Sequence, residues 1–290
     1  MDFHWVDVFA TGPLSGNPLV VAVADALPST ARMQALAAEF GVSETVFAEP
    51  GHPPRLRIFT PAAEIPMAGH PLVGAAWVLR RIGWIGDDGV LSAPGGDVAV
   101  AADDHGGRMT RPHPVAQGHA RADAVARLLG ADAVGDAPIW HAGLPQAMLE
   151  VRDLDALAPD HDGLRALGID EGWAGVSAYV MRPGGTGDAD GGGAGTPMAE
   201  VRHFAAPIGI PEDPVTGSAA AALGACLAAR GALGNGPQGR LTVMQGHRMG
   251  RPGRVDVVVD IAADGPAAVT VGGAVVPVAT GAIGPGGLAG

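Results

Sequence analysis

The chain contains no lysine, and all 18 of its basic residues are arginine. Enzymes that form a Schiff base with pyridoxal phosphate or with a carbonyl substrate need a lysine amine, and a P-loop needs a lysine beside the phosphates. The sequence therefore excludes these three kinds of site.

Cysteine and aromatic residues are also scarce. The single cysteine, Cys226, excludes a disulfide within the chain and a cysteine-based zinc site, and its apolar surroundings predict a small buried side chain. Five Trp, one Tyr and six Phe, together with a net charge of -12, do not suit a nucleic-acid surface, which needs basic patches and stacking platforms. We therefore expect no nucleic-acid partner. The ten histidines form no metal-binding motif such as H-E-x-x-H, so we do not expect a metal either.

Long apolar runs are missing as well. The first residues lack the positive start and apolar core of a signal peptide, and no run reaches the roughly 18 residues that a membrane span needs. We expect a soluble, cytoplasmic protein that does not enter a membrane.

What the sequence does contain is an internal duplication. A polar turn at 211–218 leads into an Ala/Leu helix at about 218–230, and a second turn at 66–71 leads into a similar helix at about 70–82. Aligning Gly69 with Gly217, which lie 148 positions apart, places His70 on Ser218. With 290 residues available, this pattern predicts two related halves, each with one buried central helix.

The turn before each helix predicts a binding site. Unpaired N–H groups and the helix dipole make a helix N-terminus attractive to anions. We therefore expect the two helix N-termini to face one cleft and to bind a small carboxylate.

Glu44 is the first candidate for acid/base chemistry. The stretch 42–47 is strand-like, and alternation puts Glu44 on the same face as Val42 and Val46. A carboxylate among apolar neighbours has a raised pKa, as a general acid/base near neutrality needs. The alternative is that Glu44 lies on an edge and faces water. For His70, similarly, a structural role competes with a catalytic one.

Two other kinds of site are not supported. The stretch 182–197 is rich in Gly, Asp and Thr and predicts a flexible loop, and no G-x-G-x-x-G opens a helix there, so dinucleotide binding is not expected. Ser218 follows Gly217 without the pattern of a hydrolase nucleophile, so a serine hydrolase is not expected either.

Five blocks of the sequence, in order, resemble the PhzF-like proteins of phenazine biosynthesis. The blocks are VDVF (6–9) with GNP (16–18), SETVF (43–47), FTP (59–61) with GHP (69–71), EDPVTGSA (212–219), and QG (245–246) with GRP (250–252). The resemblance covers about residues 3 to 260.

The resemblance implies a diaminopimelate-epimerase-like α+β fold, with two pseudo-symmetric halves and the active site in the cleft between them. Each half would be a barrel-like sheet around its central helix. We expect the first half at 1–117, the second at 118–280 and a flexible tail at 281–290. The family also implies a homodimer, a place in secondary metabolism and no cofactor.

The resemblance further implies a reaction similar to that of trans-2,3-dihydro-3-hydroxyanthranilate isomerase, with Glu44 moving a proton between ring carbons. His70 and Asp213 would position and polarise the substrate, and Ser218 would hydrogen-bond to it. Backbone amides around Gly69 and His70 and around Gly217 and Ser218 would hold its carboxylate, and Thr216 would also bind the substrate. The wider superfamily uses one or two cysteines at these helix ends, and here His70 and Ser218 stand instead, which excludes stereoinversion by two thiols.

Three functions remain open at this point. The first is a cofactor-independent isomerase acting on a small cyclic amino or hydroxy carboxylic acid. The second is a related enzyme with a hydrolytic or tautomerising reaction in another secondary-metabolite pathway. The third is a non-catalytic protein that binds a small molecule.

Overall fold

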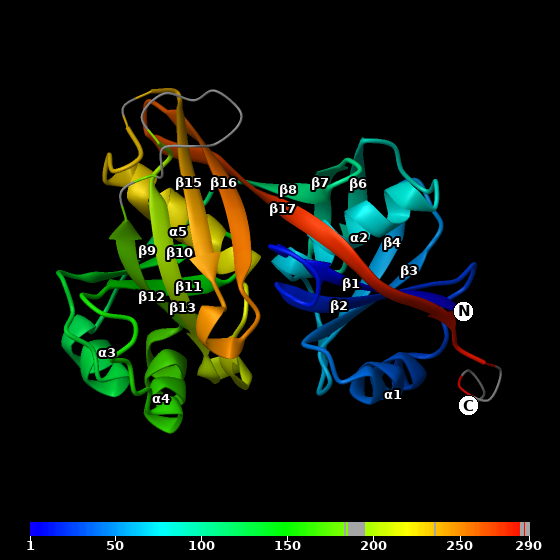
Figure 1. Cartoon of the computed structure of the whole chain (residues 1–290), viewed down its shortest axis with the longest axis horizontal. Helices are drawn as coiled ribbons and strands as arrows, with labels where there is room; N and C mark the ends of the chain where they lie inside the picture. The colour runs from blue at the N-terminus through cyan, green and yellow to red at the C-terminus, as the bar shows by residue number, and fades with distance from the viewer. Residues whose placement is uncertain (183, 185–194, 235, 285–286, 288–290) are drawn as a thin grey trace. The chain divides into compact units, whose positions relative to one another are not determined.

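The structure is a computed structural model that describes residues 1–182, 184, 195–234, 236–284 and 287 (Figure 1). It forms two compact units, Met1–Thr110 with Gly272–Gly290 and Arg111–Val271. Most of the loop predicted at 182–197, and much of the tail predicted at 281–290, lies outside the described residues. Among the described residues, no helix is long and apolar enough to cross a membrane.

The strands of the first unit close on themselves. They are β1 (Asp2–Val8), β2 (Asn17–Val23), β3 (Glu44–Glu49), β4 (Arg55–Phe59), β5 (Glu64–Ile65), β6 (Asp88–Ala93), β7 (Gly96–Ala102), β8 (Gly106–Pro112) and the last part of β17 (Gly265–Ala282). Pairing runs β17–β1–β2–β3–β4–β6–β7–β8 and returns to β17. A closed barrel leaves no open edge of unpaired backbone groups.

The last strand departs from the predicted boundaries. The second half was expected to run to residue 280, but Gly272–Gly290 belongs to the first unit. Val8 pairs with Val275 and Asp2 with Ala282 along an antiparallel ladder. The physical reason is that the backbone groups on both edges of β1 need hydrogen-bond partners. β2 pairs with one edge, and the last part of β17 pairs with the other.

The second unit repeats the strand order of the first. Its strands are β9 (Val115–Ala120), β10 (Ala137–His141), β11 (Pro145–Glu150), β12 (Gly175–Arg182), β13 (Met198–Ala205), β14 (Ile210–Asp213), β15 (Gln238–Gln245) and β16 (Gly253–Ala262). The series β10–β11–β12–β13–β15–β16 is antiparallel, parallel, antiparallel, parallel and antiparallel, as is the series β1–β2–β3–β4–β6–β7. This agreement confirms the predicted duplication.

The central helices also match. α2 (Gly69–Arg81) and α5 (Gly217–Ala229) are each 13 residues long and are buried over nearly their whole length. Both helices are followed by a glycine in the left-handed backbone conformation, Gly83 with φ of 79° and Gly231 with φ of 72°. The predicted helix limits are therefore correct to within one residue.

The remaining helices cover outer faces of the sheets. α1 (Thr30–Phe40) begins at Ser29, whose side chain accepts from Arg32 N, and ends at the left-handed Gly41, as its sequence predicts. α3 (Ala122–Leu129) and α4 (His161–Glu171) belong to the second unit, where their apolar side chains share a core with β11, β12 and β13.

Candidate active site

Glu44 is the first residue of β3, and it is buried. Only 8% of the residue is exposed, so the alternative in which it faces water is wrong. Its position is fixed by the parallel ladder between β2 and β3, in which Leu19 is its partner. The Glu44 carboxylate is thus held in the interior of the first unit by regular backbone pairing.

Burial changes the acidity of this carboxyl group. Desolvation raises the pKa of Glu44 from 4.5 to about 7, and the hydroxyl of Ser43 offsets part of the rise. That hydroxyl is itself held by Asn17, whose Oδ1 lies 3.0 Å from Ser43 Oγ. With a pKa near neutrality, Glu44 can both accept and return a proton under physiological conditions.

His70 lies beside Glu44 in the same unit. It belongs to the first turn of α2, is 4% exposed, and places Nε2 3.5 Å from Glu44 Oε2. The helix begins after Ala68, which provides no side-chain cap, so no capping side chain competes for the N–H groups of the first turn. The structure therefore brings Glu44, His70 and Gly69 together at a helix N-terminus.

In the second unit, Asp213 and Thr216 form the turn before α5. Asp213 ends β14 and is 8% exposed, and the hydroxyl of Thr216 donates to Asp213 Oδ2. Thr216 is the N-cap residue, but its side chain makes no cap bond, because it is turned toward Asp213. Gly217 and Ser218 follow as the first residues of α5. These four predicted residues therefore lie close together in the chain, between positions 213 and 218.

Gln245 belongs to the QG block at 245–246, and the sequence alone assigns it no role, whereas the structure does. It is buried, and its Nε2 donates to the carbonyl of Asp213 at 2.8 Å and to Thr216 Oγ1 at 3.2 Å. Its Oε1 accepts from Thr216 N at 3.2 Å. The buried amide thus fixes the turn, which lies about 30 positions earlier in the chain and could not be paired with it from the sequence alone.

Two other glutamates near the turns are excluded as proton carriers. Glu64 binds Arg57 through two contacts of 2.7 and 2.5 Å, and Glu212 binds Arg202 through two of 2.9 and 2.8 Å. The guanidinium of Arg57 lowers the pKa of Glu64. Because both carboxylates are bound by two-point arginine contacts, Glu44 is distinct from them.

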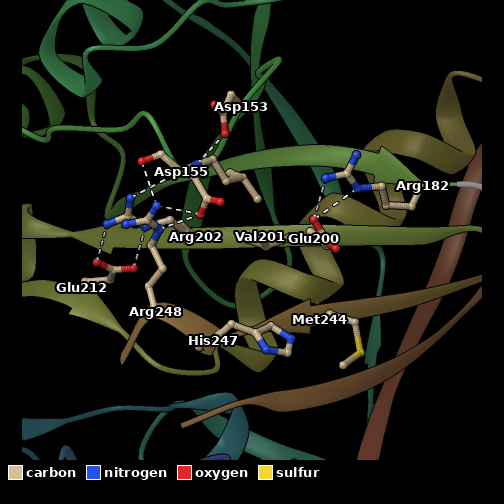
Figure 2. Close-up of a pocket in the computed structure, with 12 residues that line it drawn as sticks. Asp153, Asp155, Arg182, Glu200, Val201, Arg202, Glu212, Met244, His247 and Arg248 are labelled. Atoms are coloured by element: carbon tan, nitrogen blue, oxygen red, sulfur yellow. Dashed lines mark hydrogen bonds and ion pairs between the residues drawn. The ribbon is translucent and has the colours of Figure 1, made fainter. Parts of the chain in front are cut away.

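A pocket of about 230 Å³ lies elsewhere on the second unit (Figure 2). Three arginine–acid pairs surround it, and Figure 2 shows their contacts as dashed lines: Arg202 with Glu212, Arg248 with Asp155, and Arg182 with Glu200. None of the predicted site residues lines this pocket. Each of the three arginines that line it already binds a carboxylate.

No group of three or more His, Cys, Asp or Glu side chains that could hold a metal ion occurs in the part of the chain that the structure describes.

The two duplicated units, each with a central buried helix, have the diaminopimelate-epimerase-like fold. A PhzF-family phenazine biosynthesis protein from Bacillus anthracis has the same fold, with a TM-score of 0.80, 23% identity and 97% of each chain covered. A chain named as a probable proline racemase, from Agrobacterium radiobacter, aligns with a TM-score of 0.63 and 13% identity, over 98% of this chain and 93% of its own.

The chain belongs to the PhzC-PhzF family, described as phenazine biosynthesis-like protein, whose model matches residues 6–281. A relative from Escherichia coli O157:H7, named as the uncharacterized isomerase YddE, is 34% identical over 94% of this chain and 95% of its own length. The trans-2,3-dihydro-3-hydroxyanthranilate isomerase of Pseudomonas fluorescens is 32% identical over 85% of this chain and 86% of its own. The chain is an isomerase of this family.

Proposed function

We propose that this isomerase moves a proton between two carbons of a small cyclic amino or hydroxy carboxylic acid, with Glu44 as the only proton carrier and without a cofactor. The observation that carries the proposal is the buried Glu44 carboxyl, which has a pKa of about 7 and lies 3.5 Å from His70 Nε2. The named activity of the Pseudomonas fluorescens relative supports the same class of substrate.

The proton transfer needs both forms of Glu44. The carboxylate removes a proton from one carbon, and the electrons of that C–H bond move into the adjacent unsaturated system. The resulting carboxylic acid then returns the proton to a second carbon, so atoms and electrons balance and Glu44 is regenerated. A pKa near neutrality makes the first step and the second step comparably accessible.

The other predicted residues are assigned to the substrate by the family resemblance. His70, beside Glu44, would polarise the substrate and stabilise the charge that develops when the proton leaves. Asp213 and Ser218 would hydrogen-bond to its amino or hydroxyl groups. Its carboxylate would be bound by backbone N–H groups at Gly69 and at Gly217, in the first turns of helices α2 and α5. A homodimer and a role in phenazine or other secondary metabolism are further parts of this proposal.

Glu44→Gln tests the mechanism. It keeps the size and hydrogen-bonding capacity of the side chain but cannot carry a proton, so turnover of trans-2,3-dihydro-3-hydroxyanthranilate should fall by roughly 10²- to 10⁴-fold with little change in substrate binding. Thr45→Val is the control, because Thr45 is a buried neighbour on β3 that takes no part in the proposed reaction. Wild-type turnover by the Gln variant would show that Glu44 is not the proton carrier.

A second measurement distinguishes the reactions that the sequence left open. In D₂O, proton transfer at carbon leaves deuterium on a product carbon, whereas hydrolysis cleaves the substrate. Binding without any product would identify a non-catalytic protein and would contradict the proposal.

A further inference from the structure

Two polar residues of the sequence blocks, Asn17 and Ser43, have no role in the reaction described above, and both lie beside Glu44. Asn17 is the first residue of β2, and Ser43 comes directly before β3. The parallel ladder pairs Leu19 with Glu44, and alternation along β2 puts Asn17 on the same face as Leu19. Asn17 is fully buried, with an exposed fraction of 0%. The starts of two neighbouring strands therefore bring an amide, a hydroxyl and the carboxyl group of Glu44 together.

The hydroxyl of Ser43 has more acceptors within reach than it has hydrogens. Its oxygen lies 3.0 Å from Asn17 Oδ1 and 3.5 Å from the carbonyl oxygen of Pro18. Burial raises the pKa of Glu44 to about 7, and a hydrogen bond from this same hydroxyl opposes the rise. Because a serine hydroxyl has one hydrogen to donate, Asn17 and Glu44 compete for it.

The charge of Glu44 decides which of the two acceptors receives the hydrogen. A hydrogen bond to an ionised carboxylate is roughly twice as strong as one between neutral groups, so the hydroxyl donates to Glu44 when that residue is charged. When Glu44 is protonated, its own O–H needs an acceptor. Ser43 Oγ can accept it while the hydroxyl hydrogen points to Asn17 Oδ1. The exchange needs only a rotation of the Ser43 hydroxyl about its C–O bond.

The charged and titratable groups of the elements packed against β3 are the same in either arrangement. From α2, His70 faces Glu44, with its Nε2 3.5 Å from Glu44 Oε2, whereas Arg80 and Arg81 lie at the other end of that helix. The sequence of β2 has no titratable side chain, and α1, with Arg32 and Glu39, packs on the opposite face of the sheet. The two arginines of β4 are each bound to an acid, Arg55 to Glu49 and Arg57 to Glu64.

We propose that Ser43 and Asn17 are positioning residues that give Glu44 a hydrogen-bond partner in both of its protonation states. The Ser43 hydroxyl donates to the carboxylate before Glu44 takes a proton, and it turns to Asn17 Oδ1 while Glu44 holds that proton. A buried polar group without a partner is costly, so this exchange lets Glu44 accept and return the proton without that cost. The proposal rests on the proposed function, since it takes Glu44 to alternate between the two forms during turnover.

The test is the titration of Glu44, followed by NMR of isotope-labelled glutamate carboxyl carbons, with Glu44→Gln to assign the signal. Ser43→Ala removes the donor to the charged form and should raise the pKa by roughly 0.5 to 1 pH unit. Asn17→Leu, which is similar in size, removes the competing acceptor, so the hydroxyl stays on Glu44 and the pKa should fall by a similar amount. Asn17→Ala should act in the same direction as Asn17→Leu.

Two variants serve as controls for these opposite shifts. Ser43→Thr keeps the hydroxyl and should titrate like the wild type. Thr45→Val changes a buried residue whose side chain is on the other face of β3, and it should leave the pKa of Glu44 unchanged. Because Asn17 acts only through Ser43, the double variant Ser43→Ala/Asn17→Leu should titrate like Ser43→Ala alone.

Three results would overturn the proposal. They are an unchanged pKa in Ser43→Ala, shifts of the same sign in the Ser43→Ala and Asn17 variants, and a further shift in the double variant. Circular dichroism identifies any variant that has not folded. Ser43 is only partly buried, so Ser43→Ala and Ser43→Thr decide the matter even if the Asn17 variants do not fold.

The pH profile of kcat/KM separates this proposal from the proposed function. Glu44 must be ionised to remove a proton, so the acid limb should move to higher pH in Ser43→Ala and to lower pH in Asn17→Leu. The NMR titration needs no substrate. Shifts of the pKa that kcat/KM does not follow would therefore contradict Glu44 as the proton carrier, whereas absent shifts, with turnover still lost in Glu44→Gln, would contradict only the exchange at Ser43.

Discussion

The raised pKa of Glu44 predicts a specific pH dependence of stability. A carboxyl group that is harder to ionise in the folded state stabilises the fold below its unfolded pKa and loses that contribution as pH rises through its folded pKa. For Glu44 the window runs from 4.5 to about 7. At 1.36 kcal/mol per pKa unit, the wild-type first unit loses about 3 kcal/mol of stability from this group across the window.

Glu44→Gln removes the ionisation and therefore the loss. Whatever the substitution costs in packing, the free energy of unfolding of the variant minus that of the wild type should increase by about 3 kcal/mol between pH 4 and pH 8.5. Hydrogen exchange in increasing urea, followed by mass spectrometry of peptides from β1 to β4, measures the stability of the first unit separately.

The matched control is Thr45→Val, the next residue on the same strand. Thr45 is fully buried and does not titrate, so its variant should differ from the wild type by an amount that does not depend on pH. If the Glu44→Gln difference is equally flat from pH 4 to 8.5, Glu44 is not held near neutrality by burial, and the acid/base assignment loses its physical basis.

Three further predictions follow from single contacts. Gln245→Ala leaves the buried carbonyl of Asp213 without the donor that lies 2.8 Å away. The substitution should lower the free energy of unfolding by roughly 1–3 kcal/mol in urea titrations, and it should also lower kcat/KM. Unchanged values of both would contradict a positioning role for Gln245. Gly74→Ala would place a Cβ 2.4 Å from Leu19 Cδ2, so overpacking of α2 on the first barrel should cost roughly 1–3 kcal/mol, and a neutral result would show that the helix can shift. Cys226 is 1% exposed and burial raises its pKa to about 11, so a thiol reagent at pH 8 should label it in urea but not in the native protein.

Much of the fold was readable from local patterns. The two turn-and-helix stretches, their length and their closing glycines appear in the sequence because a buried helix requires a continuous apolar stretch, and its end favours glycine. Ser29 and Gly41 likewise mark both ends of α1. The family blocks also predict the class of enzyme, because they are short local stretches of sequence.

The sequence could not decide the partners of residues that lie far apart in the chain. Whether Glu44 faced water or the interior was open, because alternation gives the face of a strand but not what covers it. The final strand was assigned to the second half because nothing local shows that its residues from Gly272 pair with β1. Nor could the sequence show that Gln245 binds the turn at Asp213.

The sequence by itself determined the helix N-termini and the candidate acid, since each depends on one short local stretch. It also determined the duplicated architecture, since two such stretches can be aligned although they lie 148 positions apart. Tertiary structure alone placed His70 Nε2 3.5 Å from Glu44, bound Glu64 and Glu212 to arginines, and left His203 Nε2 and Gln146 Oε1 buried without a hydrogen-bond partner among the described residues. The physical reason is that a pKa and an unsatisfied hydrogen bond are set by everything that surrounds a group, and most of those surroundings come from distant parts of the chain.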